Sequence, residues 1–322
     1  MSEAKKVDVV FSTDAHYVQH FCVALTSLLE NNLKYIDRIF LITDIDEKKL
    51  LEKTLSFIYS KYRKEVTCLT IDNSIIANFK VDSYISQASY YRLFLSEILP
   101  TDVDKVLYLD SDLVVIGDLE SLTGLDFTTR INGNTKSKNT STANNCHGDL
   151  YLYAVNEMKW ENSERLQGFG LSGTKYFNAG VLLINLKKWR TEKITAKLIS
   201  IALNFKKQLK WWDQDVLNIA FENQWGEINF SFNTVNLVFE EEKKFKKQSA
   251  IIHYTGSSKP WQFRNRHPLK NIYWHYLRKT PYRYYIPNDI TLKNILYKSA
   301  LLIYSLNKKM FKKILRLVYS EL

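Results

Sequence analysis

Residues 106–116 read VLYLDSDLVVI, so Asp110, Ser111 and Asp112 interrupt an otherwise apolar run. The run predicts a buried strand that ends at Asp110. Acids at the tip of such a strand lose hydration, which costs several kcal/mol per ion unless another interaction offsets it. A hard cation with oxygen ligands provides that offset, and so does a hydrogen-bonded turn. We favour a cation, because no helix that needs a cap follows directly.

The Asp-x-Asp pattern is common, and the chain contains three further pairs: Asp44/Asp46, Asp102/Asp104 and Asp213/Asp215. The first pair precedes a helical pattern, so helix N-capping explains it. The second follows Pro100 in a turn, where aspartates hydrogen-bond to their own backbone. The third falls at an expected helix start, where capping again applies. Position in the chain therefore separates Asp110 and Asp112 from the rest.

Around this segment, strand and helix patterns alternate, which predicts an α/β fold with a parallel sheet covered on both faces. The expected strands are Val7–Phe11, Arg38–Thr43, Val66–Ile71, Lys105–Leu109, Gly180–Leu186 and Ile251–Tyr254. The expected helices include Tyr17–Glu30, Asp46–Lys61 and Ser89–Leu99, and a mobile polar loop is expected at 124–148. Ligands of such sheets bind beyond the carboxyl ends of the strands.

A second candidate segment, IIHYTGSSKPW, places His253 at the end of a short apolar strand, with Gly256 and Lys259 after it. Imidazole and carboxylate ligands together suit Mn²⁺ or a similar ion. Glycine allows a phosphate to approach the backbone, and lysine supplies a positive charge. A lone histidine is usually structural, but these neighbours favour a ligand.

One motif is rejected. Residues 168–173 match GxGxxG, but a helical pattern precedes them and the strand–turn–helix setting of a dinucleotide site is missing. The sequence also has no GxxxxGK[ST] phosphate loop.

The net charge of +11 is concentrated at the C-terminus, where residues 259–322 hold 14 Lys and Arg against two acids, Asp289 and Glu321. The rest of the chain is close to neutral, which argues against nucleic-acid binding by the main body. Residues 290–319 read as one amphipathic helix with a basic face. We favour docking on an anionic membrane surface over docking on its own domain, and both over nucleic acid.

Composition sets the remaining bounds. With 322 residues, 45% hydrophobic and 25% charged, the chain is an ordinary globular protein. Three widely spaced cysteines indicate a reducing compartment. The N-terminus lacks an apolar signal core, and no uncharged apolar run reaches the roughly 18–20 residues of a membrane span. We therefore expect a cytoplasmic protein, peripheral on the inner face of the cell membrane.

Taken together, five ordered blocks resemble glycosyltransferase family 8, the retaining enzymes of GT-A fold that use UDP-sugars, and the likeness is greatest to bacterial lipopolysaccharide and lipooligosaccharide galactosyl- and glucosyltransferases. The blocks read DVVFSTDAHY, SYYRLFLSEILP, DKVLYLDSDLVV with GDLESL, YFNAGVLLINLKKWR with WWDQDVLN, and HYTGSSKPW. The resemblance implies a GT-A domain over residues 1–285, a mostly parallel mixed sheet flanked by helices, and a basic aromatic membrane-associating tail over 286–322.

The resemblance also implies site roles. Contacts to the nucleotide-sugar fall to Ser12, Asp14, Tyr17, Arg92, Asp110, Ser111, Asn178, Gly256 and Lys259. Asp110, Asp112 and His253 would bind the metal, Mn²⁺ or Mg²⁺. The catalytic positions would be Gln214 and Asp213. Within this set, Tyr17 would stack on uracil, and Gly256 and Lys259 would hold the diphosphate. Asp213 thereby gains a functional alternative to capping.

The implied function is transfer of galactose or glucose from a UDP-sugar to a glycan or glycolipid acceptor such as lipopolysaccharide core, with an alpha-linked product. Gln214 is an amide and a poor nucleophile, so we favour front-face attack by the acceptor hydroxyl over a covalent intermediate through Asp213. Two alternatives stay open: an inactive UDP-sugar-binding partner protein, and a glycosyltransferase that acts on protein acceptors.

Overall fold

The computed structural model describes residues 5–44, 48–71, 79, 87–128, 149–157, 160–172, 175–235 and 249–301, with 303, 304 and 307. Most of the loop expected at 124–148, and residues 308–319 of the helix expected at 290–319, lie outside this part of the chain. So does Asp46 of the first aspartate pair.

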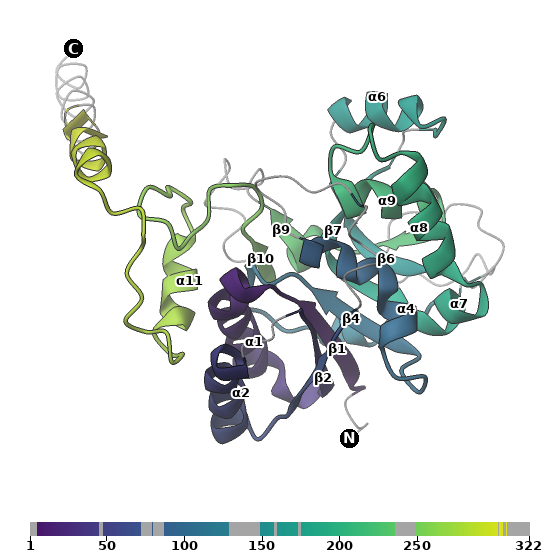
Figure 1. Cartoon of the computed structure of the whole chain (residues 1–322), viewed down its shortest axis with the longest axis horizontal. Coiled ribbons are helices and arrows are strands. Elements are labelled where there is room, and N and C mark those ends of the chain that lie inside the picture. The colour runs from purple at the N-terminus through teal and green to yellow at the C-terminus, as the bar shows by residue number, and fades with distance from the viewer. Residues whose placement is uncertain are drawn as a thin grey trace, which may run out of the picture.

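A central sheet of seven strands runs in the order β3-β2-β1-β4-β7-β6-β8 (Figure 1). Its strands are β1 (Val7–Ser12), β2 (Ile36–Ile42), β3 (Val66–Leu69), β4 (Lys105–Leu109), β6 (Leu152–Asn156), β7 (Phe177–Asn185) and β8 (Trp225–Glu227). Neighbouring strands are parallel except β7, which is antiparallel to both β4 and β6. The sheet is thus mostly parallel but mixed, as the resemblance implies.

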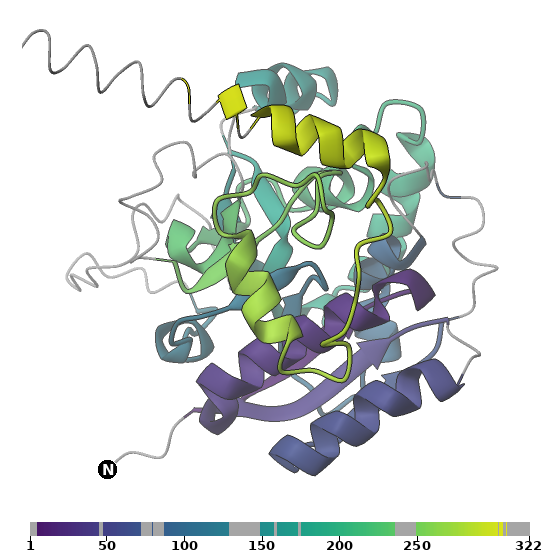
Figure 2. The same ribbon diagram turned by 90° about the vertical axis from the view of Figure 1, so that its left-hand side faces the viewer.

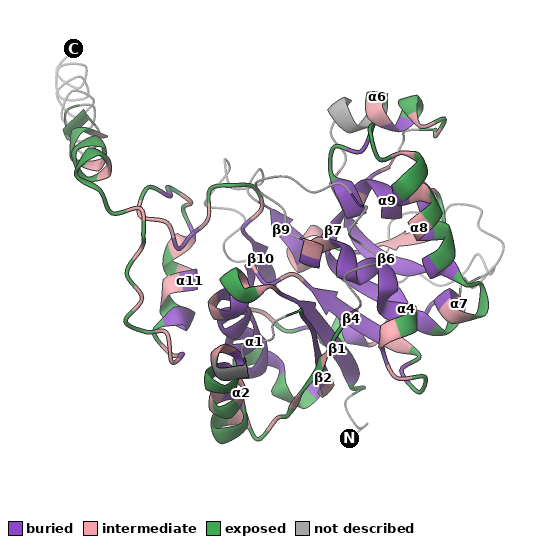
Figure 3. Ribbon diagram, viewed as in Figure 1, coloured by how far each residue is buried: buried purple, intermediate pink, exposed green. Residues whose placement is uncertain are grey.

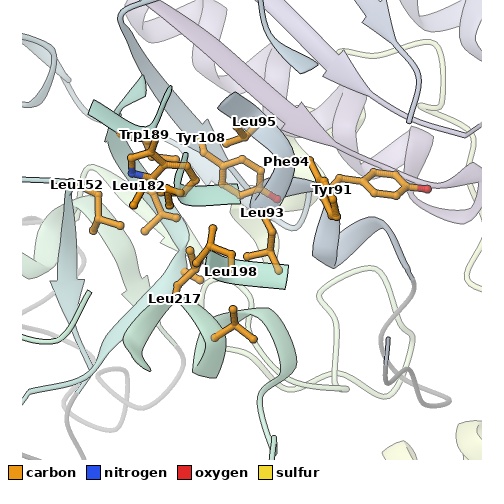
Figure 4. Packing of buried hydrophobic residues seen from close by; sticks show 14 of the residues in the cluster. Tyr91, Leu93, Phe94, Leu95, Tyr108, Leu152, Leu182, Trp189, Leu198 and Leu217 are labelled. Atoms are coloured by element: carbon orange, nitrogen blue, oxygen red, sulfur yellow. The ribbon is translucent and has the colours of Figure 1, made fainter. Parts of the chain in front are cut away.

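Helices cover both faces of this sheet because alternate strand residues are apolar on each face. The helices are α1 (Val18–Asn32), α2 (Lys48–Tyr62), α4 (Leu95–Ile98), α5 (Glu120–Thr123), α6 (Trp160–Gly168), α7 (Leu186–Thr191), α8 (Ile194–Asn204), α9 (Trp212–Ala220) and α11 (Lys270–Leu277). On one face Val9 and Leu107 pack with Phe21 of α1. On the other, Tyr108 and Leu182 pack with residues of α7, α8 and α9 (Figure 4).

The segment expected as one helix at 89–99 differs in detail. It forms a 3₁₀ segment, η3 (Gln87–Phe94), followed by the single turn of α4 before Pro100. Residues 90–95 are all buried, including Arg92. Because the segment is buried on all sides, the spacing of its apolar residues does not favour an α-helix over the tighter 3₁₀ helix.

A small second sheet carries the chain across the carboxyl end of the first. Its order is β5-β10-β9, formed by β5 (Leu113–Val115), β10 (Ile251–His253) and β9 (Thr234–Val235). β10 pairs antiparallel with β5, which sets His253 opposite Leu113. The segment after Asp110 therefore lies beside the segment that ends in His253.

The C-terminal region packs on α1 through α11 and ends, among the described residues, in a helix that contacts the loop after β10. Figure 2 shows α11 lying across α1 and a further helix, residues 292–301, beyond it. In Figure 3 the strands are buried, whereas this last helix is largely exposed. Within the described residues, no helix has the length and apolarity needed to cross a bilayer.

Candidate active site

The two central carboxylates and a histidine come together at the tip of β4. Asp110 donates its backbone N–H to the Gly180 carbonyl of β7 (2.9 Å), and the Asp112 carbonyl accepts from Tyr254 N–H (3.0 Å). His253 Nε2 lies 3.6 Å from Asp110 Oδ2 and 3.1 Å from Asp112 Oδ1. One ligand atom from each of the three residues falls within 4.8 Å of the others. The two sheets thus place the Asp–Asp–His set at a single point.

The hydrogen bonds of His253 fix the orientation of its ring. Its Nδ1 lies 2.9 Å from Asn233 Oδ1, an acceptor, so Nδ1 carries the proton. Nε2 then faces two carboxylates, an arrangement that a cation shared among the three residues would stabilise. Asn233 is in turn fixed by its amide N–H₂, which donates to Asn178 Oδ1 (2.8 Å). The donor set therefore fits a divalent cation.

Gly180 makes room for this set. A Cβ at this position would lie 2.1 Å from His253 Cε1 and 2.8 Å from Asp110 Oδ2, distances that real Cβ atoms do not show. Neither neighbour is the free end of a flexible chain, since His253 is 4% exposed and hydrogen-bonded. Only glycine lets β7 pass this close to the ligands.

Lys259 supplies positive charge at the same point. Its Nζ lies 2.5 Å from Asp112 Oδ2 and donates to the Tyr254 carbonyl (2.8 Å). Burial alone would raise the pKa of Asp112, but Lys259 and His253 outweigh it and hold that pKa below its usual range. Asp112 is therefore a carboxylate at neutral pH. Gly256, three residues before Lys259, has φ +79°, a conformation that side chains rarely adopt.

Arg92 joins this cluster to the expected catalytic residues. The buried guanidinium reaches Asp110 Oδ1 through Nη2 (2.7 Å) and Asp213 Oδ2 through Nε (3.1 Å). Burial raises the pKa of Asp213 to about 7, although Arg92 opposes that rise. Tyr108, whose hydroxyl donates to Asp110 Oδ1 (2.9 Å), lies with its ring under Arg92. Arg92 thus fixes two carboxylates relative to each other.

The backbone of β7 holds the sugar-side candidates. Gln214 Oε1 accepts from Ala179 N–H (3.0 Å), and Asn178 Oδ1 accepts from Gly180 N–H (2.9 Å). Asn178 also donates to Glu157 (2.8 Å). Gln214, which lies on α9, and Asn178 are therefore both anchored within two residues of Gly180.

The aspartates at the start of α9 have different partners, which corrects their joint interpretation as caps. Asp215 Oδ2 accepts from the backbone N–H groups of Lys210 and Trp211 (2.8 Å each), so it does stabilise the turn into the helix. Asp213 instead faces Arg92, whose Nε lies 3.1 Å from Asp213 Oδ2. Trp212, immediately before it, has φ +38°.

The expected nucleotide contacts lie at the end of β1. Ser12 Oγ is 2.7 Å from the Tyr108 hydroxyl, and Ser111 Oγ donates to the Ser12 carbonyl (2.9 Å). Asp14 accepts from the N–H groups of His16 and Tyr17 and so starts the short helix η1 (Ala15–Tyr17). Burial, followed by the charges of Asp112, Asp14 and Asp110, raises the pKa of the Tyr17 hydroxyl. These residues therefore border the carboxylate cluster.

Four residues of the site were missed by sequence reasoning: Tyr108, Glu157, Gly180 and Asn233. Tyr108 carried a signal, as a polar atom in an apolar strand two residues before Asp110. Asn233 carried none, because its role depends on a pairing between segments 20 residues apart.

A mostly parallel sheet with an Asp-x-Asp site at its carboxyl end defines a glycosyltransferase of GT-A fold, and solved structures agree. Galactosyltransferase LgtC, solved with donor and acceptor sugar analogues, superimposes with a TM-score of 0.71 at 26% identity, over 88% of this chain and 98% of that one.

Within that class, the chain belongs to glycosyl transferase family 8, whose family model matches residues 8–265. Among curated proteins it is 27% identical over 292 residues to lipopolysaccharide 1,2-glucosyltransferase of Escherichia coli K12, covering 88% of this chain and 81% of the relative. It is also 25% identical over 300 residues to general stress protein A of Bacillus subtilis, covering 87% and 96%.

Proposed function

We propose that this protein transfers galactose or glucose from a UDP-sugar to a lipid-linked glycan of the lipopolysaccharide-core type, with retention of the anomeric configuration and dependence on Mn²⁺ or Mg²⁺. The observation that carries the proposal is the Asp110–Asp112–His253 set, with Lys259 on one side and the Arg92–Asp213 pair on the other. The named activities of its relatives, a lipopolysaccharide glucosyltransferase and a galactosyltransferase, support a hexose and a glycan acceptor.

The donor's diphosphate leaves as an anion, so the site must stabilise negative charge where it develops. A divalent ion held by Asp110, Asp112 and His253 would supply positive charge to the diphosphate. Lys259 supplies a second charge from the chain itself, and Gly256 leaves the backbone open to a phosphate oxygen. Ser12, Asp14, Tyr17 and Ser111 border the place for the nucleoside.

The sugar becomes oxocarbenium-like as the bond from its anomeric carbon to the β-phosphate oxygen breaks. The acceptor oxygen bonds to that carbon on the same face, and the acceptor's proton passes to the departing phosphate. Gln214 carries no charge and its carbonyl oxygen is engaged by Ala179 N–H, so we assign it to orienting the sugar face. Asp213, tied to Arg92, positions the sugar side of the site together with Asn178.

The C-terminal segment supports action at a membrane. We assign residues 286–322 to membrane association and place the protein at the inner face of the cell membrane. Among the described residues of this segment, large apolar side chains lie in solvent, Leu292 at 73% and Leu296 at 60% exposure. Lys293 and Lys298 lie on the same helix. Exposed apolar and basic side chains on one helix suit an anionic lipid surface.

A donor panel tests the proposal. UDP-galactose, UDP-glucose and related UDP-sugars are assayed for UDP release with and without Mn²⁺, with membrane glycolipid extract as acceptor. We expect one hexose donor to support transfer, with loss of at least 100-fold for Asp112→Asn, because that change removes a charged ligand. Full transfer by the variant in Mn²⁺ would refute the metal assignment. UDP binding without hydrolysis or transfer would identify an inactive binding protein instead.

A further inference from the structure

The loop after β10 carries both proposed diphosphate contacts, and much of its shape is fixed internally. Gln262 donates its backbone N–H to the Lys259 carbonyl (3.0 Å), and its Oε1 accepts from Lys259 N–H (2.9 Å). Asn265 donates to Ser258 Oγ (3.0 Å). The upstream end is held by β10 through His253. After Lys259, Trp274 Nε1 donates to the Pro260 carbonyl (2.9 Å) and Trp261 stacks on His20 (3.5 Å between ring centroids), and the next two residues, Phe263 and Arg264, have an anchor of their own.

Asp289 provides that anchor from the C-terminal segment. Its Oδ1 accepts from Phe263 N–H (2.6 Å) and its Oδ2 from Arg264 N–H (3.0 Å), so both carboxylate oxygens hold adjacent backbone groups. Hydrogen bonds from an N–H to an ionised acceptor are among the stronger ones in proteins. They close the loop four and five residues after Lys259.

The position of Asp289 is itself well supported. Its carbonyl accepts from Asn294 Nδ2 (2.6 Å), at the start of the helix 292–301. Tyr297 of that helix lies against the Arg264 guanidinium, 4.8 Å from the ring centroid, and the Lys298 ammonium lies 4.0 Å from the ring centroid of Phe263. The last described helix is therefore packed against the same loop that Asp289 binds.

Charge makes this contact distinctive. Residues 259–322 contain 14 Lys and Arg but only two acids, and one of the two is Asp289. The acid sits where the loop bearing Lys259, Arg264 and Arg266 meets the basic helix. A carboxylate here offsets repulsion between two cationic segments as well as binding the backbone.

We propose that Asp289 is a positioning residue for donor binding: it holds residues 259–264 so that Lys259 and Gly256 meet the diphosphate. The inference rests on the proposed function. It means that a residue at the start of the C-terminal tail contributes to donor binding. Because Asp289 acts on the loop and contacts no expected sugar-side residue, its loss affects donor affinity more than turnover.

The test uses the full-length chain with Mn²⁺ and compares UDP with UMP, which lacks the β-phosphate. For Asp289→Ala we expect about tenfold weaker UDP binding and a tenfold higher KM for the UDP-sugar. UMP binding and kcat should stay within twofold. Asp289→Asn, which keeps one acceptor oxygen, should show a smaller loss, about threefold. If Asp289→Ala does not fold, the comparison is made on Asp289→Asn.

Thr291→Ala is the matched control, since Thr291 Oγ1 accepts from Asn294 N–H (3.2 Å) and caps the same helix without touching the loop. It should leave UDP binding unchanged. Equal losses for UDP and UMP, unchanged UDP binding in both Asp289 variants, or the same loss in Thr291→Ala would each overturn the inference. Absence of UDP binding in the unaltered protein would instead refute the proposed function.

Discussion

The carboxyl end of the central sheet and the C-terminal segment arrange charge in opposite ways. Beside the end of the sheet, Arg92 of η3 and Asp213 of α9 are each 5% exposed, and each is paired with an opposite charge inside the protein. In the C-terminal segment, basic and apolar side chains both face solvent. The first region holds charges in fixed positions for chemistry on a small ligand. The second region leaves apolar and basic side chains exposed to solvent, which is typical of a region that binds a large surface.

The largest expected effect on activity comes from filling the space that Gly180 leaves beside His253 and Asp110. Gly180→Ala would place a Cβ 2.1 Å from His253 Cε1, so the histidine must leave the two aspartates or β7 must shift. We expect transfer activity to fall by at least 100-fold, with about 1–3 kcal/mol lost in the free energy of unfolding. Activity assays and denaturant unfolding measure the two effects.

Gly168→Ala is the control for that variant. This glycine ends α6, and an added Cβ would have no atom within 4 Å. Its activity and stability should match those of the unaltered protein. A Gly180→Ala protein that keeps more than a third of its activity would contradict the described packing of His253.

The joint between the two regions gives the next effect. His20 of α1 stacks on Trp261 with ring centroids 3.5 Å apart, and its Nδ1 lies 2.6 Å from the Tyr273 hydroxyl. Burial lowers the pKa of His20 to about 3; Asp112 opposes and Lys259 reinforces that shift. The unfolded chain binds a proton at His20 near pH 6.5, but the folded chain does not. Stability from this residue is therefore present above pH 6.5 and is lost as pH falls towards 3.

His20→Phe keeps an aromatic ring on Trp261 but removes the titrating group and its hydrogen bond. At pH 8 we expect the variant to be about 1 kcal/mol less stable, for the lost hydrogen bond. Between pH 6.5 and 5 the unaltered protein should lose about 1.6 kcal/mol relative to the variant, since the slope rises from about half of 1.4 kcal/mol per pH unit at pH 6.5 to nearly that full value at pH 5. Urea unfolding across pH measures this. Parallel curves for the two proteins, or the same change in His275→Phe at an exposed position of α11, would show that His20 does not titrate as described.

Sequence reasoning went further for the fold than for the site. Strand β4 falls where its apolar run predicts, because a central strand that is buried on both faces leaves a continuous apolar run in the sequence. The Asp110–Asp112 pair stood out in the sequence because carboxylates at the end of a buried strand lose hydration. The rest depends on long-range pairing: Asn233 and Gly180 reach the same point from different elements, and Asp289 reads in sequence as an isolated acid in a basic tail. The sequence pattern shows which residues are apolar, but it does not show which segments lie next to each other in the fold.

The smallest effect concerns the exposed region. Replacing Leu292 and Leu296 together by serine removes apolar surface that is 73% and 60% exposed and makes no contact with the site. We expect about tenfold weaker partition onto anionic lipid vesicles, with unchanged unfolding and unchanged activity on a water-soluble acceptor. Tyr59→Ser is the control, since Tyr59 is 50% exposed on α2 and lies outside the tail. Vesicle co-sedimentation measures partition, and equal partition by all three proteins would mean that the C-terminal helix does not bind lipid. Loss of activity on the soluble acceptor would mean instead that these leucines serve the donor loop, as Asp289 does, and that the two regions are less separate than their surfaces suggest.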